Sequence, residues 1–465
     1  MTTSTPAVAR RTRRAGMLAA AIGVAVFACY NANGREIGSF DSQPTKYTVV
    51  QLVAHRSFML DTIVARRPAL GERTGFAVAR DGHVRSAYSV APAVLAWLPA
   101  EILAATRLVP PRRSAAGLYA KVSASLLVTL AVVFVFFAAR WRTSDGWAAL
   151  VALGFGLGTN AWPTASQTLW QHESTLAGLA LAVLCLAPPA ARLNAYRLSL
   201  AAIGLGAAGA ARYQVAPAVL ILAISVMART RRARDVVALL PVVLCAAVMI
   251  GVNMLWFGHP LGALAGLEGT LHPQIHGVGR SLSSTPWTGA LGLLVSPSRG
   301  LLVFSPVVIV ALAGLGATRR EGWKSDLGWC ALAALAQFGL YATYSVWWGG
   351  HTYGPRYLID LLPLLVPLAA AGTGVLRASR LARAAAGAAL AWSVALAATG
   401  AFCYPAEAWN TSPASVDLYH QRLWEWRDPQ FVRCWRTGLS PQNLGLFTRR
   451  PASKLMSPPP SSDNP

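Results

Sequence analysis

The sequence predicts an all-α, polytopic integral membrane protein with about eleven transmembrane helices and a large first extracytoplasmic loop. Of its 465 residues, 54% are hydrophobic and only 13% are charged, and the mean hydropathy is +0.44. Soluble domains carry about 25% charged residues. The hydrophobic residues also gather in runs close to the roughly 20 residues that a membrane-spanning helix needs.

The formal net charge of +23 comes from short arginine clusters between the apolar runs, at residues 10–14, 229–234, 319–320 and 377–383. Proteins that bind nucleic acid gather their basic residues on one polar face or arm. Clusters in the loops between apolar segments are instead typical of cytoplasmic loops in membrane proteins. We therefore expect no nucleic-acid partner and assign residues 1–14 as a basic cytoplasmic N-terminus.

Eleven apolar segments are candidates for membrane-spanning helices within a transmembrane domain at residues 15–403. They are residues 15–30, 117–138, 146–164, 174–189, 198–212, 214–228, 237–257, 299–317, 327–347, 358–376 and 385–403. With a cytoplasmic N-terminus and alternating sides, every loop that carries an arginine cluster falls on the cytoplasmic side. The outer face is then shared by residues 31–116, 168–174, 258–298 and 347–357 and by the tail at 404–465.

This topology requires that the apolar stretch 88–108 does not cross the membrane as an ordinary helix. Its Pro92, Pro99 and Glu101 suit a lipid-facing span poorly. We expect a membrane-associated or re-entrant segment within the external loop 31–116. The alternative is a true crossing at 88–108, with one segment miscounted within 198–228.

The two ends of the chain have their own patterns. A basic stretch before a short apolar run resembles a signal peptide, but the rest of the chain is polytopic, so we favour an uncleaved first helix. The tail at 404–465 is rich in Trp and Arg and ends in SPPPSSDNP, which has too little apolar content to fold by itself. We expect disorder at its end, and its aromatic part could lie at the membrane interface.

The first candidate for chemistry on the outer face is Asp41, which follows the first helix closely. It lies in the turn sequence SFDSQP and precedes Lys46 and Tyr47. A carboxylate beside a water-filled cavity can act as a general base. The alternative is structural, since Asp41 or Ser42 would cap a helix that begins at Pro44.

A second candidate lies in the turn TLWQHES, which contains His172 and Glu173. A neutral histidine can exchange a proton near pH 7, and with a carboxylate it can bind a metal ion. Adjacent helical residues point about 100° apart, so these two side chains do not form a ready-made pair. The alternative is that they cap the helix that follows.

Arginines at three external helix ends indicate a site for an anionic lipid or a sugar phosphate. Arg356 follows the glycine-rich stretch WWGGHTYGP, Arg212 lies in a tight turn, and Arg299 closes the third external loop. Arginine can donate two parallel hydrogen bonds to a phosphate group. For residues 347–357 the alternative is an interfacial anchor, because Trp, Tyr and Arg are common at membrane boundaries.

The order of these features resembles the C-type (GT-C) membrane glycosyltransferases, which include bacterial aminoarabinose transferases and polyprenyl-phosphate-mannose mannosyltransferases. FDSQPTKY resembles the first-loop motif of that class, with Asp41 at the catalytic acid and Lys46-Tyr47 in place of Arg-Tyr. RSAYSVAPAVLAWLP at 85–99 resembles its proline-rich segment, and GPRYLIDLLPLLVPL resembles its Arg-Tyr-Leu helix. The similarity covers roughly residues 15–375 and is closest to bacterial members that carry LLVSPSRGLLVFSP and WWGG.

This resemblance implies a polyprenyl-phosphate sugar donor and an envelope acceptor that is a lipid, a glycan or a protein. Asp41 would take the proton of the acceptor hydroxyl as it attacks and inverts the anomeric carbon. The donor phosphate would be bound by Arg356, Arg212, Arg299 and Lys46, and substrate would contact Tyr47, Tyr357, Trp348 and His351. Asp41 is followed by Ser42 instead of a second acid, and Glu173, beside His172, is the candidate for the missing carboxylate.

Two other functions remain open from the sequence: a transporter or lipid flippase, and a non-catalytic scaffold with the same fold. Clean helices and the lack of a clear repeat favour the enzyme over the transporter, while the missing second acid keeps the scaffold open. No cofactor is certain, although His55, His172 and Glu173 could hold a divalent ion. We expect a multi-pass protein of the inner (cytoplasmic) membrane, in contact with membrane lipids, whose active site faces outside.

Overall fold

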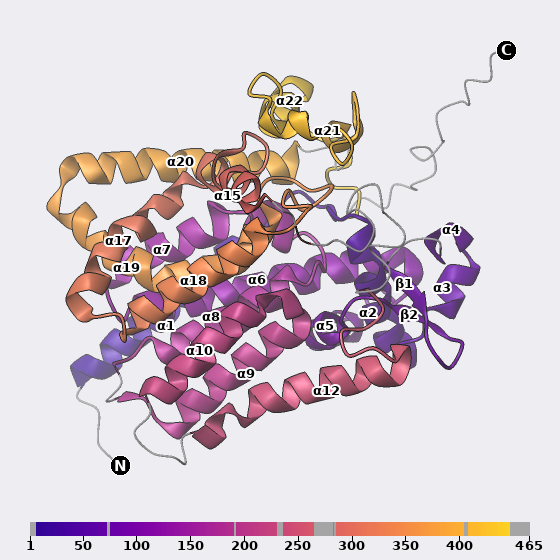
Figure 1. Cartoon of the computed structure of the whole chain (residues 1–465), viewed down its shortest axis with the longest axis horizontal. Coiled ribbons are helices and arrows are strands. Elements are labelled where there is room, and N and C mark those ends of the chain that lie inside the picture. The colour runs from indigo at the N-terminus through magenta and orange to yellow at the C-terminus, as the bar shows by residue number, and fades with distance from the viewer. Residues whose placement is uncertain are drawn as a thin grey trace.

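The computed structural model of the chain describes residues 6–71, 75–189, 192–229, 236–264, 282, 285–403 and 408–446. Long helices run side by side through the body of the molecule, and shorter elements gather at one end of it (Figure 1). The all-α prediction is confirmed, since the strands of the described residues form a single two-stranded sheet.

The body of the molecule consists of these helices: α1 (Pro6–Asn31), α6 (Ala116–Ala139), α7 (Asp145–Leu157), α8 (His172–Leu186), α9 (Ala195–Ala211), α10 (Ala216–Arg229), α12 (Leu240–Phe257), α15 (Pro286–Val295), α16 (Leu301–Phe304), α17 (Ile309–Glu321), α18 (Asp326–Ala342), α19 (Leu362–Ala378) and α20 (Arg380–Phe402). Short helical turns join or extend them: η2 (Arg113–Ala115), η3 (Ala161–Ala165), η5 (Tyr213–Val215), η6 (Val237–Leu239), η7 (Pro306–Val308) and η8 (Arg356–Leu361).

Five stretches of the described residues are long and apolar enough to cross a membrane: Thr12–Asn31, Arg113–Ala139, Val237–Phe257, Arg356–Ala378 and Arg380–Phe402. Six further apolar helices are shorter. A multi-pass membrane protein is therefore confirmed, whereas helix length alone does not confirm eleven spans. The expected span 299–317 is broken between α16 and α17, because Pro306 lacks the backbone N–H that a continuous helix would need.

Hydrogen bonds bring the arginine-bearing loops together at one end of the body, here called the basic end. Arg142, after α6, pairs with Glu321 of α17 at 2.8 Å and with Asp326 at the start of α18. Arg229, at the end of α10, donates to the carbonyl oxygens of Leu186, the last residue of α8, and of Pro188, just after it. These loops were predicted to lie on one side of the membrane, because successive segments cross it in alternate directions. In the structure they lie together.

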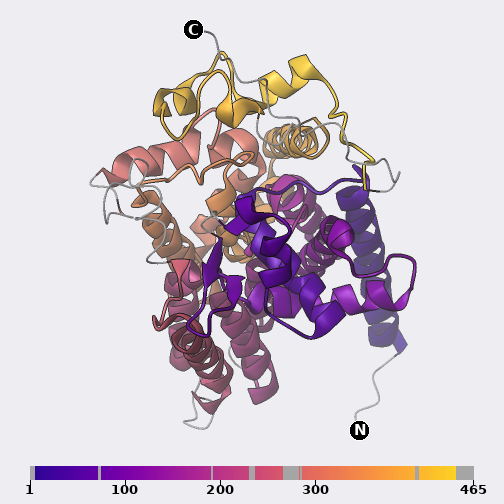
Figure 2. The ribbon, with the colours of Figure 1, turned by 90° about the vertical axis from the view of Figure 1, so that its right-hand side faces the viewer.

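The opposite end, here called the polar end, carries the first loop. Its elements are η1 (Phe40–Ser42), α2 (Gln43–His55), α3 (Asp61–Ala65), α4 (Pro68–Gly71), β1 (Phe76–Val78), β2 (Val84–Ser86) and α5 (Ala91–Ala105). The strands pair antiparallel, with Phe76 opposite Ser86. Figure 2 looks onto this end and shows the first-loop elements in front of the helix ends.

Helix α5, which contains most of the stretch 88–108, starts and ends near the polar end. Just before it, the hydroxyl of Ser89 donates to the carbonyl oxygen of Ala210, at the end of α9. Just after it, the carbonyl oxygen of Val109 accepts from Tyr119, in the first turns of α6. The chain therefore enters and leaves α5 at the same end of the body, as expected for a segment that does not cross.

The C-terminal segment folds back onto the polar end through α21 (Ala408–Thr411), η9 (His420–Trp424) and α22 (Gln430–Thr437). Trp409, Leu423 and Phe431 are buried in one apolar cluster with Trp347 and Trp348. Trp424, Trp426 and Trp435 are instead exposed, by 39%, 63% and 49%, so an interfacial location of this part of the tail stays a prediction. The end of the tail and residues 265–281 and 283–284 of the loop 258–298 lie outside the described residues.

Candidate active site

Asp41 lies in η1, a turn that is capped by Ser39, whose side chain accepts from the backbone N–H of Asp41. Its own carboxylate caps no helix, so the structural alternative for this residue is wrong. Instead, Oδ1 accepts from the hydroxyl of Tyr88 at 3.2 Å, and Oδ2 accepts from Nη1 of Arg356 at 2.7 Å. The side chain of Asp41 is 39% exposed, so the carboxylate is held in place yet reachable from solvent.

Arg356 begins η8, the turn that leads into α19. Its guanidinium lies 5.0 Å from the ring centre of Trp170 and 5.7 Å from that of Tyr357. Gly354 turns the chain into η8 with a φ of +63°, and a Cβ there would press against the amide of Asn160. The glycine thus meets both a backbone and a packing requirement that other residues would strain, which explains part of the WWGGHTYGPRY motif.

A second acid, Asp360, lies one turn further along η8 and is completely buried. Its Oδ1 is 2.8 Å from Nδ1 of His172, and its Oδ2 is 3.0 Å from Nε of Arg212 and also accepts from Tyr341. Nε2 of His172 lies 3.4 Å from Nη1 of Arg212. Because arginine can only donate, His172 is a neutral imidazole that accepts through Nε2 and donates to Asp360 through Nδ1.

The two acid–arginine pairs meet at the ring of Tyr357. The guanidinium carbons of Arg356 and Arg212 lie 5.7 and 5.6 Å from the centre of this ring. The ring of Tyr341 stacks against it, with the two ring centres 5.2 Å apart. The assembly, here called the Asp41–Asp360 network, consists of Asp41, Tyr88, Trp170, His172, Arg212, Tyr341, Arg356, Tyr357 and Asp360. Its two carboxylates and two guanidiniums balance in charge, as a buried polar cluster requires.

Five of the residues predicted from the sequence thus belong to one network: Asp41, His172, Arg212, Arg356 and Tyr357. They come from the first loop, from the first residue of α8, from the turn after α9 and from η8. The predicted phosphate ligand Arg212 differs in one respect from expectation, since its charge is already matched by Asp360.

Glu173 is directed away from this network. Its buried carboxylate accepts from the backbone N–H groups of Trp170 and Gln171, at 3.0 and 3.3 Å, and so holds the turn that precedes α8. Glu173 therefore has the capping role that the sequence left open, whereas the side chain of His172 faces Asp360.

Lys46 and Tyr47 also lie outside the network. Lys46 forms an ion pair at 2.9 Å with Glu36, which in turn accepts from Thr168, so the first loop is tied to the turn before α8. Tyr47 is buried in the apolar cluster of the first loop.

The guanidinium of Arg299 forms structural hydrogen bonds. It is fully buried and donates to the carbonyl oxygens of Trp348, Ser298 and Gly350 and to the side chain of Asn410. It therefore joins the loop at 346–354 to the C-terminal segment and does not face the network.

Trp348 and His351 also join the loop at 346–354 to the C-terminal segment. The carboxylate of Asp417 accepts from Nε1 of Trp348 at 2.8 Å and lies 3.0 Å from Nε2 of His351. Burial by itself would raise the pKa of the Asp417 carboxyl, but the hydrogen bonds from His351 and Trp348 hold that pKa below its ordinary value.

Sequence reasoning missed Asp360, Tyr341, Tyr88 and Trp170 as members of the network. Asp360 had a usable signal, since it is an acid inside an otherwise apolar segment, and such residues usually have a function. The two tyrosines carried none. No group of three His, Cys, Asp or Glu side chains in the described parts of the chain is placed to hold a metal ion, and His172 and Glu173 have the other partners given above.

A scan against protein-family models and a search of curated proteins found no match. Solved structures do match. The Archaeoglobus fulgidus oligosaccharyltransferase in its apo form is 11% identical over 89% of this chain and 60% of its own, with a TM-score of 0.51. The same enzyme tethered to an acceptor peptide gives 11% identity, 89% and 59% coverage and a TM-score of 0.49.

ArnT from Cupriavidus metallidurans bound to undecaprenyl phosphate is 13% identical over 77% of this chain and 59% of its own, with a TM-score of 0.44. The chain thus spans about 60% of the length of these structures. The apo oligosaccharyltransferase match covers most of the chain and carries the fold assignment. This chain therefore shares its fold with the Archaeoglobus fulgidus oligosaccharyltransferase.

Proposed function

We propose that this protein is a membrane glycosyltransferase that moves a sugar from a polyprenyl-phosphate carrier to a hydroxyl group of an envelope lipid, glycan or protein. The observation that carries the proposal is the contact between Asp41, a partly exposed acid of the first loop, and Arg356, an arginine at the head of a membrane helix. Support also comes from the shared fold with the archaeal oligosaccharyltransferase.

In the proposed reaction, the acceptor oxygen attacks the anomeric carbon from the side opposite the phosphate and inverts it. The bond between that carbon and the phosphate oxygen breaks, and its electron pair stays on the phosphate. Asp41 takes the proton of the acceptor hydroxyl. The products are a glycoside and a polyprenyl phosphate, and general-base help of this kind gives roughly 10²–10⁴-fold in rate.

Arg356 would stabilise the departing phosphate. Its Nε atom is buried and has no hydrogen-bond partner among the described residues, so the guanidinium keeps a donor for a ligand. Fixed positive charge in a site that excludes water is often the largest contribution to catalysis. A phosphate at Arg356 would also compete with Asp41 for the same cation, which frees the carboxylate to act as a base.

Asp360, His172 and Arg212 would act as positioning residues. Arg212 and Tyr341 hold the ring of Tyr357, against which Arg356 lies. Asp360 in turn holds Arg212 and Tyr341. The proposed location is the inner membrane, with the polar end facing outside, where such an acceptor would be found.

The test compares envelope lipids and glycans by mass spectrometry in cells that lack the protein and cells complemented with variants at equal abundance. Asp41→Asn should fail to restore a glycan that the wild type restores. Asp81→Asn is the matched control, because Asp81 is an exposed acid of the same loop that pairs only locally, with Arg85. Full restoration by Asp41→Asn would refute the proposal in favour of a transporter or a scaffold.

A further inference from the structure

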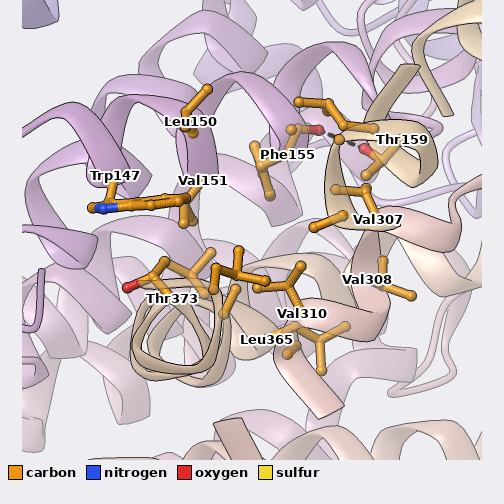
Figure 3. Close-up of a pocket in the computed structure, with 18 of the residues that line it drawn as sticks. Trp147, Leu150, Val151, Phe155, Thr159, Val307, Val308, Val310, Leu365 and Thr373 are labelled. Atoms are coloured by element: carbon orange, nitrogen blue, oxygen red, sulfur yellow. Dashed lines mark hydrogen bonds between the residues drawn. The ribbon is translucent and has the colours of Figure 1, made fainter. Parts of the chain in front are cut away.

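An apolar cavity of about 320 Å³ lies between α7, α17, α19 and α20. Figure 3 shows Trp147 and Thr373 at one end of it and Thr159 and Val307 at the other. None of the residues of the Asp41–Asp360 network lines this cavity. The network and the cavity lie against different helices, since Asp360 faces α8 and α18.

The space exists because α20 presents small residues to its neighbours. Ala386 and Gly387 line the cavity, and a Cβ built on Gly387 would meet no atom within 4 Å. By contrast, α17 and α19 touch so closely at Gly314 and Gly372 that a Cβ on either would collide with the facing backbone. Wall atoms that face an empty space lose their dispersion contacts, so a chain from the bilayer that fills the space is favoured.

Among the described residues, Arg383 is the only charged one that lines the cavity. It is exposed, and it forms no ion pair within the described part of the chain. It belongs to the basic end: Thr373 of the cavity wall bonds to Thr143, in the loop that follows α6. Arg377 and Arg380 lie in the same turn between α19 and α20. Basic residues at a membrane surface attract anionic lipids.

We propose that the cavity binds one hydrocarbon chain of an anionic phospholipid, with the phosphate of the lipid on Arg383 at the basic end. Apolar walls and a single cation at one end match a molecule with a long apolar chain and an anionic head. The carrier lipid of the proposed transferase fits less well, because its phosphate is needed at Arg356, at the polar end. The lipid site is thus independent of the transferase activity.

The test uses the purified full-length protein in neutral detergent, stripped of lipid. Dioleoyl phosphatidylglycerol, dioleoyl phosphatidylcholine, a polyprenyl phosphate and glycerol 3-phosphate are each added, and bound lipid is measured by native mass spectrometry alongside thermal unfolding. Phosphatidylglycerol should bind and raise the unfolding temperature. Phosphatidylcholine, which has no net charge, and glycerol 3-phosphate, which has no hydrocarbon chain, should do so only weakly.

Two variants locate the site. Arg383→Ala should weaken phosphatidylglycerol binding by about tenfold or more, since it removes a charge-assisted hydrogen bond. Gly387→Leu should fill the cavity and block the lipid while the protein stays folded. Arg13→Ala, an exposed arginine on α1 that does not line the cavity, is the matched control and should bind like the wild type.

Three outcomes would overturn the proposal. Equal binding of phosphatidylglycerol and phosphatidylcholine would show that Arg383 does not select an anionic lipid. Unchanged phosphatidylglycerol binding by Gly387→Leu would place the lipid elsewhere. A polyprenyl phosphate whose binding depends on Gly387 and Arg383 but not on Arg356 would make the cavity the carrier site, and it would also contradict the proposed phosphate role of Arg356.

Discussion

Nη1 of Arg356 donates to Oδ2 of Asp41 across 2.7 Å, so an acid of the first loop and an arginine 315 residues later neutralise each other. The arginine is the more buried partner, with 11% of its side chain exposed against 39% for the acid. An anionic ligand that approaches the pair would therefore meet both an attractive arginine and a repulsive aspartate.

This competition predicts opposite effects of two substitutions on the binding of a polyprenyl phosphate. Asp41→Asn should tighten binding several-fold, because it removes the negative charge and leaves the arginine available. Arg356→Ala should weaken binding by roughly tenfold or more, since a hydrogen bond to a charged group contributes about 1.5–3 kcal/mol. Native mass spectrometry of the purified variants measures both effects.

Arg112→Ala is the matched control for Arg356→Ala, because Arg112 is an exposed arginine of the first loop, in which Asp41 also lies. Its binding should equal that of the wild type. Weaker binding by Asp41→Asn would contradict the competition and would indicate that the carboxylate contacts the ligand favourably.

Asp360→Asn should destabilise the protein strongly. Asp360 and Arg212 are both buried, and removal of one partner of a buried ion pair typically costs about 3–5 kcal/mol, since the other charge stays without compensation. The double variant Asp360→Asn with Arg212→Met removes both charges and should recover most of the loss. Thermal unfolding in detergent distinguishes the two cases, and additive losses in the double variant would argue against the pair.

The contact between α17 and α19 predicts a sharp difference between two glycines of one helix. Gly372 lies against the carbonyl of Val310, whereas Gly374 has no atom within 4 Å of a built Cβ. Gly372→Val should lower the free energy of unfolding by about 1–3 kcal/mol or more, because the helices must move apart. Gly374→Val should cost far less, and equal unfolding temperatures for the two variants would contradict the observed packing.

Asp417 is expected to hold the C-terminal segment onto the loop at 346–354. Its pKa is below the ordinary value of about 3.9, so the stabilisation is present above about pH 4 and is lost as the pH falls through the lower value of the folded state. Asp417→Asn should remove the contribution at neutral pH. Hydrogen–deuterium exchange of residues 408–446 should then be faster.

Glu425→Gln is the control for this change, since Glu425 is an exposed acid of the same segment. Its exchange should match that of the wild type at every pH. Similar exchange in Asp417→Asn and the wild type would mean that Arg299 and the apolar cluster hold the segment without the carboxylate.

The sequence by itself determined that the protein is a helical membrane protein with a large polar first loop. That information is local: a bilayer requires apolar runs with internally bonded backbones, and arginine clusters sort the loops between them. It also singled out Asp41, Arg212 and Arg356, because charged residues at the outer ends of the apolar helices are few. Asp360 could have been added on the same ground.

Only the tertiary structure decided which of these charges work together. Arg212, Arg299 and Arg356 look alike in sequence, yet Asp360 neutralises the first, backbone carbonyls surround the second, and only the third meets Asp41. The cavity beside α20 was equally invisible, since its walls come from four helices. The reason is geometric: side-chain partners depend on how each helix is rotated and packed against its neighbours, and local sequence patterns do not encode that arrangement.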